Sequence, residues 1–148
     1  MCVVKVTMLL ADHAQVADGK LNIIGGGWSI TGPVPGPSAI AMLIQVPWDQ
    51  TNQKQRMRLE LVDSDGVPVA VDTPEGRTEV VIEGEFEAGR PVGLKPGTPI
   101  DMPVAIDLPP QPIPPGGRYE WRLSINDRSE DDWTLAFSTR PDNAAQAV

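Results

Sequence analysis

The spacing of turn signals sets the main limit on what this chain can fold into. Runs of strand length, either apolar or alternating, are separated by Pro, Gly and Asp-Gly signals at intervals of roughly 8–12 residues. No segment predicts a helix of more than a turn or two. The pattern therefore predicts an all-β chain that folds as a single-domain antiparallel β-sandwich of about eight or nine strands. The expected strands are 3–10, 20–30, 38–46, 55–62, 67–71, 78–87, 100–108, 118–126 and a last strand marked by Trp133, Leu135 and Phe137.

The length and the cysteine content agree with one disulfide-free domain. A chain of 148 residues can bury about two-thirds of its unfolded surface in one core. Cys2 is the only cysteine, so no disulfide can form within the chain. We expect residues 1–140 to form the domain and the small, polar segment 141–148 to be a flexible C-terminal tail.

The charge balance argues against several partners. The formal net charge is -8, from 20 acidic and 12 basic side chains, and the basic residues are scattered along the chain. A surface of this sign repels phosphate backbones, so nucleic acid is not an expected partner. No apolar run reaches the roughly 18 residues needed to span a membrane. Lys5 and Thr7 interrupt the first apolar run, which does not resemble a signal peptide. We expect a soluble, cytoplasmic protein that is not secreted through a signal peptide.

Three consecutive glycines, Gly25, Gly26 and Gly27, separate an apolar run from Trp28. Glycine tolerates positive φ and the close approach of another backbone, so the triplet predicts a structural bend or bulge. The bend would let the chain cross from one sheet to the other and would fix the direction of Trp28. The triplet lacks the spacing and the lysine of a phosphate-binding loop, so no nucleotide cofactor is expected here.

Two Asp-Gly dipeptides predict tight hairpin turns. The first, Asp18-Gly19, ends a connection over residues 11–19 and leads into the strand 20–30, which we expect to pair with 3–10. The second, Asp65-Gly66, is expected to join the strand that precedes it to 67–71.

The segment Pro-Gly-Gly-Arg-Tyr-Glu-Trp, residues 115–121, narrows the type of sandwich. A Pro-Gly corner followed by an inward tyrosine resembles the tyrosine corner of immunoglobulin-like sandwiches. Tyr119 would form the corner, and Trp121 takes the position that a cysteine holds in antibody domains. We therefore predict an immunoglobulin-like, Greek-key sandwich in which Trp121 and Phe137 cover each other across the last hairpin.

No group of side chains predicts catalysis, a cofactor or a metal centre. His13 is the only histidine, and the neighbouring Asp12 would point away from it in an extended segment. One cysteine and one histidine cannot supply a four-ligand zinc site. Acidic residues within 63–65 and 127–132 leave weak calcium binding open, although a hairpin turn and a solvated loop explain them better. We expect no enzyme activity and no small-molecule cofactor.

One expected strand carries a row of acidic side chains. Glu83, Glu85 and Glu87 recur at every second position and therefore share a face. Like charges on one face repel each other unless cations lie opposite them. Arg56 and Arg58, on the outward face of another expected strand, are the candidates that would balance the row.

Trp28 and Trp48 both lie beside strand-breaking residues, where a tryptophan belongs either to the core or to an exposed patch. Tryptophan and arginine are enriched at binding hot spots, so we predict an interface formed by Trp28, Trp48, Arg90 and Leu94. The expected function is a non-enzymatic binding or assembly module that contacts protein partners, including further copies of itself. The alternative is a carbohydrate-binding module or hydrolase whose cleft would be lined by the two tryptophans and acidic residues.

Several motifs taken together resemble a known group of proteins. They are L-L-A-D-H-A, G-K-L-N-I-I-G-G-G-W, V-P-W-D, F-E-A-G-R-P and the C-terminal R-Y-E-W-R-L-S-I. In these motifs the chain is similar to an uncharacterised family of small actinobacterial proteins, with phages of those bacteria as a second expected source. The resemblance implies a β domain with no established activity and carries over no catalytic residue. It adds one alternative function, an accessory or decoration protein of a bacteriophage particle, for which the location would be the virion.

Overall fold

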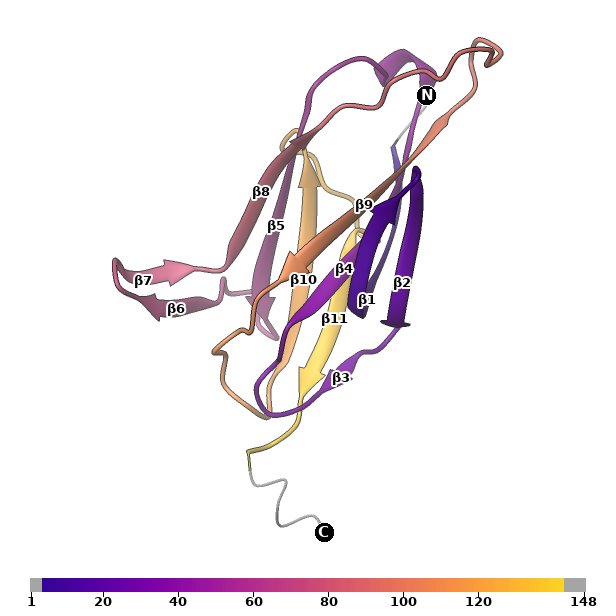
Figure 1. Ribbon diagram of the computed structural model, residues 1–148. Helices are drawn as coiled ribbons and strands as arrows, with labels where there is room; N and C mark the ends of the chain where they lie inside the picture. Colours follow the sequence, from indigo (N-terminus) through magenta and orange to yellow (C-terminus); the bar gives the residue numbers. More distant parts are fainter. Residues whose placement is uncertain (1–3, 143–148) are drawn as a thin grey trace.

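The computed structural model describes residues 4–142, and in this range the chain consists of β-strands joined by turns and one short 3₁₀ turn (Figure 1). The all-β prediction is therefore confirmed. The strands are β1 (Lys5–Ala17), β2 (Lys20–Gly26), β3 (Ile30–Thr31), β4 (Ser38–Val46), β5 (Gln55–Asp63), β6 (Ala70–Thr73), β7 (Gly76–Glu79), β8 (Val81–Phe86), β9 (Ile100–Leu108), β10 (Arg118–Ile125) and β11 (Thr134–Thr139), and the 3₁₀ turn is η1 (Trp48–Gln50).

The strands form two main sheets and one small hairpin. The four-stranded sheet has the order β2-β1-β4-β9, and the five-stranded sheet has the order β3-β11-β10-β5-β8. Neighbouring strands are antiparallel except for β3 and β11, which run parallel. The strands β6 and β7 form a separate two-stranded hairpin.

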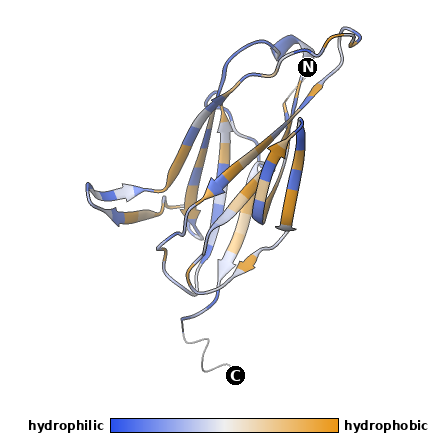
Figure 2. Cartoon of the chain, viewed as in Figure 1, coloured by the Kyte–Doolittle hydropathy of each residue, from blue (hydrophilic) through white to orange (hydrophobic). Residues whose placement is uncertain are grey.

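A single large hydrophobic core lies between the two sheets. Alternate residues of the central strands point into it, which gives the banded pattern of hydrophobic and hydrophilic residues along the strands (Figure 2). Full burial of each such side chain stabilises the fold by about 1.5–3 kcal/mol. The largest side chains with almost no exposed surface are Leu10, Ile40, Met42, Ile44, Leu59, Leu61, Trp121 and Leu123.

The first hairpin differs from the prediction, because the segment 11–19 is not a connection. β1 continues to Ala17, and the turn at Asp18-Gly19 joins it directly to β2. Both turn residues have positive φ, 52° at Asp18 and 68° at Gly19, as expected for a two-residue turn of the primed type. The polar residues in 11–19 hid the strand, since they alternate with small apolar residues such as Ala14.

The glycine triplet forms a bend without an inserted residue. The pairs Ala11 with Gly26 and His13 with Ile24 keep one register, so neither strand carries the extra residue of a bulge. Asp12 lies opposite Gly25, whose φ is 62°, in the left-handed region that favours glycine. The prediction of a bend is therefore supported, whereas a bulge is not present.

Beyond this bend the β1–β2 hairpin folds back across the outer face of its own sheet. In a flat sheet, β1 and β9 would lie about 10 Å apart with β4 between them, and β2 would lie further away. The Cα atoms of β1 and of β2 nevertheless approach those of β9 within 8 Å. Ala14 packs on Ala39 and Ala41, which face away from the main core and are almost completely buried. Alanine at these positions lets the two layers approach closely.

The chain crosses between the sheets directly after the glycines. The N–H of Gly27 donates to the carbonyl of Leu10 at 2.7 Å, which ends the pairing with β1. The carbonyl of Ser29 then accepts from the N–H of Ser138 at 2.8 Å, and β3 continues as the parallel edge strand beside β11. The predicted sheet-to-sheet crossing is therefore present at residues 27–29.

The region between β5 and β9 contains a hairpin that the sequence did not reveal. The single strand expected over 78–87 is divided into β7 and β8, and β7 pairs with β6 around a turn at Pro74-Glu75. β7 is fully exposed and therefore carries no apolar alternation that would mark it. Val80 separates β7 from β8, and its N–H donates to the carbonyl of Val69 at 2.9 Å.

Tyr119 makes the hydrogen bond expected of a tyrosine corner. Its hydroxyl donates to the carbonyl of Pro114, five residues upstream, at 2.7 Å. A Cβ on Gly117 would lie 2.8 Å from the Tyr119 hydroxyl, so glycine is needed there for the ring to lie beneath the corner. Phe137 lies opposite Tyr119, with ring centroids 5.7 Å apart, whereas Trp121 lies opposite Leu135. Trp121 and Phe137 are therefore diagonal neighbours on the last hairpin and do not lie opposite each other.

Replacement of Tyr119 by phenylalanine is expected to lower the free energy of unfolding by about 1–2 kcal/mol near neutral pH, because the hydroxyl bond is lost. Burial, and to a smaller extent the carboxylate of Asp63, raise the pKa of Tyr119. A raised pKa in the folded state means that the native protein loses stability as the pH rises above the unfolded value of about 10. The stability difference between wild type and Tyr119→Phe should therefore shrink at alkaline pH. Urea unfolding across this pH range measures it, and a constant difference would contradict the assignment.

Candidate functional site

Two of the predicted interface residues meet at one end of the molecule. Trp48 begins η1 directly after β4, and Arg90 lies in the segment that joins β8 to β9. The guanidinium carbon of Arg90 lies 3.9 Å from the centroid of the Trp48 ring, within the range of a cation–π contact. Its Nη2 also donates to the Trp48 carbonyl at 2.7 Å. Arg90 therefore contacts both the ring and the backbone carbonyl of Trp48.

Thr51 contacts both Trp48 and Arg90, and we call the contacts among these three residues the clamp. Its side chain is almost fully buried, and its hydroxyl donates to the Trp48 carbonyl at 2.6 Å while accepting from Nε of Arg90 at 2.6 Å. The N–H of Asn52 donates to the carbonyl of Ala88 at 2.7 Å, which adds a backbone link between the same two segments. Since an arginine presents its donors in a rigid fork, these contacts hold the start of the β8–β9 segment in one position.

The segment beyond Arg90 projects from the end of the molecule (Figure 1). We call residues 91–99 the apical loop. Val92 is fully exposed at 104% and Leu94 is 38% exposed, so the loop presents two apolar side chains two positions apart in the sequence. Gly93, with φ of 90°, provides the reversal between them. The loop therefore presents two exposed apolar side chains, and the contacts of Arg90 fix the position where it begins.

Trp28 lies apart from this clamp. It follows β2 and precedes β3, at the end of the molecule opposite to η1 and the apical loop (Figure 1). Its ring meets Phe137 edge to face, with centroids 6.4 Å apart and planes at 83°, and it packs against the main core. Its Nε1 is buried and has no hydrogen-bond partner within residues 4–142. The structure therefore does not bring Trp28 together with Trp48, Arg90 and Leu94.

A hollow of about 540 Å³ lies beside Trp28, and we call it the basal hollow. Its wall includes Asp12 and Gly25 from the bent hairpin and Ile30 from the edge strand β3, together with Thr31 and residues 36–38. Ile30 is 58% exposed. This hollow was not predictable from residue patterns, because its residues come from three segments that meet only after the chain has crossed between the sheets.

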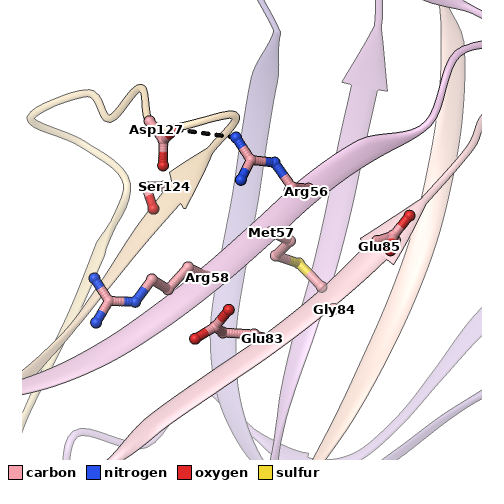
Figure 3. A pocket seen from close by; sticks show the side chains of 8 residues that line it. All are labelled: Arg56, Met57, Arg58, Glu83, Gly84, Glu85, Ser124 and Asp127. Atoms are coloured by element: carbon pink, nitrogen blue, oxygen red, sulfur yellow. Dashed lines mark hydrogen bonds and ion pairs between the residues drawn. The ribbon is translucent and has the colours of Figure 1, made fainter.

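A second, charged hollow of about 300 Å³ lies where β5, β8 and the turn after β10 meet (Figure 3). Arg56 lies opposite Glu85 in the register of β5 and β8, and Arg58 lies opposite Glu83. The close ion pairs go elsewhere, from Arg56 to Asp127 at 3.0 Å and from Arg58 to Glu60 at 3.2 Å. The arginines therefore lie on the same sheet as Glu83 and Glu85 and opposite them, as predicted, but none of the close ion pairs among residues 4–142 joins an arginine to this row. Such exposed charges add little to stability.

The acidic and histidine positions do not assemble into a metal centre in the part of the chain that the structure describes. His13 lies exposed on β1. Asp63 is used by its own turn, since its Oδ1 accepts the N–H groups of Asp65 and Val67 at 2.9 and 3.0 Å. This contact explains the acidic Asp63-Ser64-Asp65 run as a hairpin turn. Within the same range, no helix has the length and apolar character needed to cross a membrane.

The chain thus forms a two-sheet β domain with the apical loop, which carries two exposed apolar side chains, at one end and the basal hollow at the other. A family of unknown function, DUF6941, has a family model that matches residues 6–138, and the chain belongs to that family. The matched range includes both sheets, the apical loop and the basal hollow. None of the curated proteins and none of the solved structures compared with the chain matches it. An uncharacterised family is thus confirmed, whereas an actinobacterial or phage origin stays a prediction.

Proposed function

We propose that the protein is a non-enzymatic binding and assembly module that contacts protein partners, including copies of itself, through the apical loop. The observation that carries this proposal is the full exposure of Val92 and the partial exposure of Leu94 on a loop whose base is fixed. Removal of apolar surface from water is favourable by about 25 cal/mol per Å². A partner that covers Val92 and Leu94 would therefore be bound with a favourable hydrophobic contribution.

The clamp at Arg90 supports binding for a second reason. A loop that must be ordered on association costs about 0.5–1.5 kcal/mol for each side chain that is immobilised. The contacts of Arg90 with Trp48 and Thr51 already fix the start of the loop in the free protein. Pro91, Pro96 and Pro99 further limit the backbone of the loop itself. The apical loop is therefore preorganised for contact.

We also propose that the sheets form an immunoglobulin-like, Greek-key sandwich. Three lines of support are the strand order β5-β10-β11, which corresponds to C-F-G, the order β1-β4-β9, which corresponds to A-B-E, and the corner at Tyr119. In this architecture the loops at the two ends of the sheets commonly carry binding.

The alternative of a carbohydrate-binding or hydrolytic cleft is less favoured. A cleft lined by both Trp28 and Trp48 would require these residues at one place, but they lie at opposite ends of the molecule. The charged hollow at β5 and β8 contains arginines next to its glutamates and no tryptophan.

Sedimentation velocity over a wide concentration range tests the proposed function. We expect the wild-type protein to associate as the concentration rises, and the double variant Val92→Asp/Leu94→Asp to remain monomeric, since a charge at the tip must be desolvated on contact. Val67→Asp is the matched control, because Val67 is also exposed, at 55%, but lies in a distant turn. A wild type that stays monomeric up to the millimolar range, or a double variant that associates as well as the wild type, would contradict the proposal.

A further inference from the structure

The apical loop and the lining of the basal hollow each contain one charged residue, and the two charges have opposite signs. Lys95 is the one charged residue in the apical loop, and its charge is opposite to the net charge of -8 of the whole chain. Among the residues that line the basal hollow, Asp12 is the one that carries a charge. Neither Lys95 nor Asp12 forms an ion pair with another residue in the range 4–142. Each end therefore offers an unused charge that the other end would complement.

Both ends also contain apolar side chains that are at least partly exposed. The tip of the apical loop presents Val92 and Leu94, and the wall of the basal hollow presents Ile30 and part of Trp28. The tip is convex and projects beyond the sheets, whereas the other surface is concave, with a volume of about 540 Å³. Two aliphatic side chains near a lysine are a group that a hollow with these walls and one carboxylate can accept.

We infer that the basal hollow is the binding site for the apical loop of a second copy of this chain. Val92 and Leu94 of one copy would lie against Ile30 and Trp28 of the next, and Lys95 would lie near Asp12. This inference rests on the proposed function and names the partner surface. Because the hollow and the loop lie at opposite ends, the contact is heterologous: each bound copy leaves one free loop and one free hollow. Such contacts produce rings when the rotation closes and open filaments when it does not.

Two blocked variants test this inference. The first, Val92→Asp/Leu94→Asp, has an intact hollow and a defective loop. The second, Ile30→Asp, has an intact loop and a hollow with an additional charge, at a position that is 58% exposed and therefore tolerant of substitution. Each variant alone should be monomeric by light scattering coupled to size exclusion. An equimolar mixture should form a complex of two chains that does not grow further, because only one loop and one hollow remain functional.

Neutral substitutions of similar size test the proposed contact between Lys95 and Asp12 separately. Asp12→Asn, Lys95→Gln and their combination should each weaken wild-type self-association by about two- to fivefold, because an exposed ion pair contributes little. The double variant should be no weaker than either single variant if the two side chains meet. Circular dichroism spectra matching the wild type confirm that each of these chains is folded.

The outcomes separate this inference from the proposed function. If Ile30→Asp alone associates as the wild type does, or the mixture of folded blocked variants stays monomeric, the hollow is not the partner of the loop, although loop-mediated association can still hold. If Val92→Asp/Leu94→Asp associates normally, both the inference and the proposed function are wrong. A mixture that forms complexes of two chains, with both variants monomeric alone, supports the inference.

Discussion

Replacement of Trp121 by alanine should destabilise the protein by about 3–5 kcal/mol, the range found for removal of large aromatic side chains from cores. Trp121 is 1% exposed and lies near the middle of β10, between Leu61 on β5 and Leu135 on β11. Its indole is the largest side chain with almost no exposed surface. Alanine would leave a cavity that the two flanking strands cannot close without loss of their hydrogen bonds. Since small domains are stable by about 5–15 kcal/mol, this loss removes a large part of the total.

Urea unfolding followed by far-ultraviolet circular dichroism measures this effect without using tryptophan fluorescence. Val92→Ala is the control, because Val92 is fully exposed and its truncation should change the free energy of unfolding by less than about 0.5 kcal/mol. Trp121→Phe should lie between the two, because it keeps an aromatic ring in the same place. A loss below about 1 kcal/mol for Trp121→Ala would mean that the core does not depend on this side chain.

The strands bounded by proline or glycine were predictable from the sequence alone. β4 runs from Ser38 to Val46, as expected, because Pro37 and Pro47 flank it and cannot continue a central strand. β9 likewise has the predicted limits, Ile100 to Leu108, and it accommodates Pro103 because it is an edge strand. At these places the local chemistry and the tertiary structure favour the same boundaries, so a pattern of residues is sufficient.

The folded-back hairpin could not be predicted in the same way. Both faces of the segment 38–46 are mostly apolar, which indicates that the strand is covered on both sides, but Ala39 and Ala41 do not indicate which segment covers the face away from the main core. Their burial depends on Ala14 and Leu21, which belong to a hairpin that covers them only after the bend at Gly25. The information lies in the relation between two distant segments and not in the period of either one.

The candidate site was predicted in part for a similar reason. Trp48 and Arg90 were recognised as residue types that favour interfaces, but their direct contact depends on two segments 42 residues apart in the sequence. Val92 was not singled out, since valine between Pro91 and Gly93 carries no periodic signal and reads as an ordinary loop residue. Its importance follows from its exposure, which only the structure provides.

The bend at Gly25 connects the fold to the proposed assembly. Gly25 and Asp12 lie opposite each other in the hairpin, and both belong to the wall of the basal hollow. The chain then passes through Gly27 to Trp28 and Ile30, which form the apolar part of the same wall. A change in the angle of the bend would therefore alter the core contact of Trp28 and the shape of the hollow together.

Replacement of Gly25 by valine is expected to lower the free energy of unfolding by about 2–5 kcal/mol. A φ of 62° places any β-branched residue in a strained backbone conformation, at a cost of about 1–3 kcal/mol. A Cβ at this position would also collide with Oδ2 of Asp12 and lie 2.7 Å from its Cγ, which adds the cost of overpacking. Thermal and urea unfolding measure the sum of the two effects.

Gly19→Val separates these effects, because Gly19 has a similar φ of 68° but no heavy atom within 4 Å of its Cβ position. It should show the backbone strain alone and destabilise less than Gly25→Val. Asp12→Ala, introduced into the Gly25→Val chain, should recover part of the loss by removing the atoms that collide. If both valine variants cost the same and Asp12→Ala recovers nothing, the close packing of Asp12 on Gly25 does not determine the bend. The backbone conformation of residue 25 would then be the only reason for a glycine at this position.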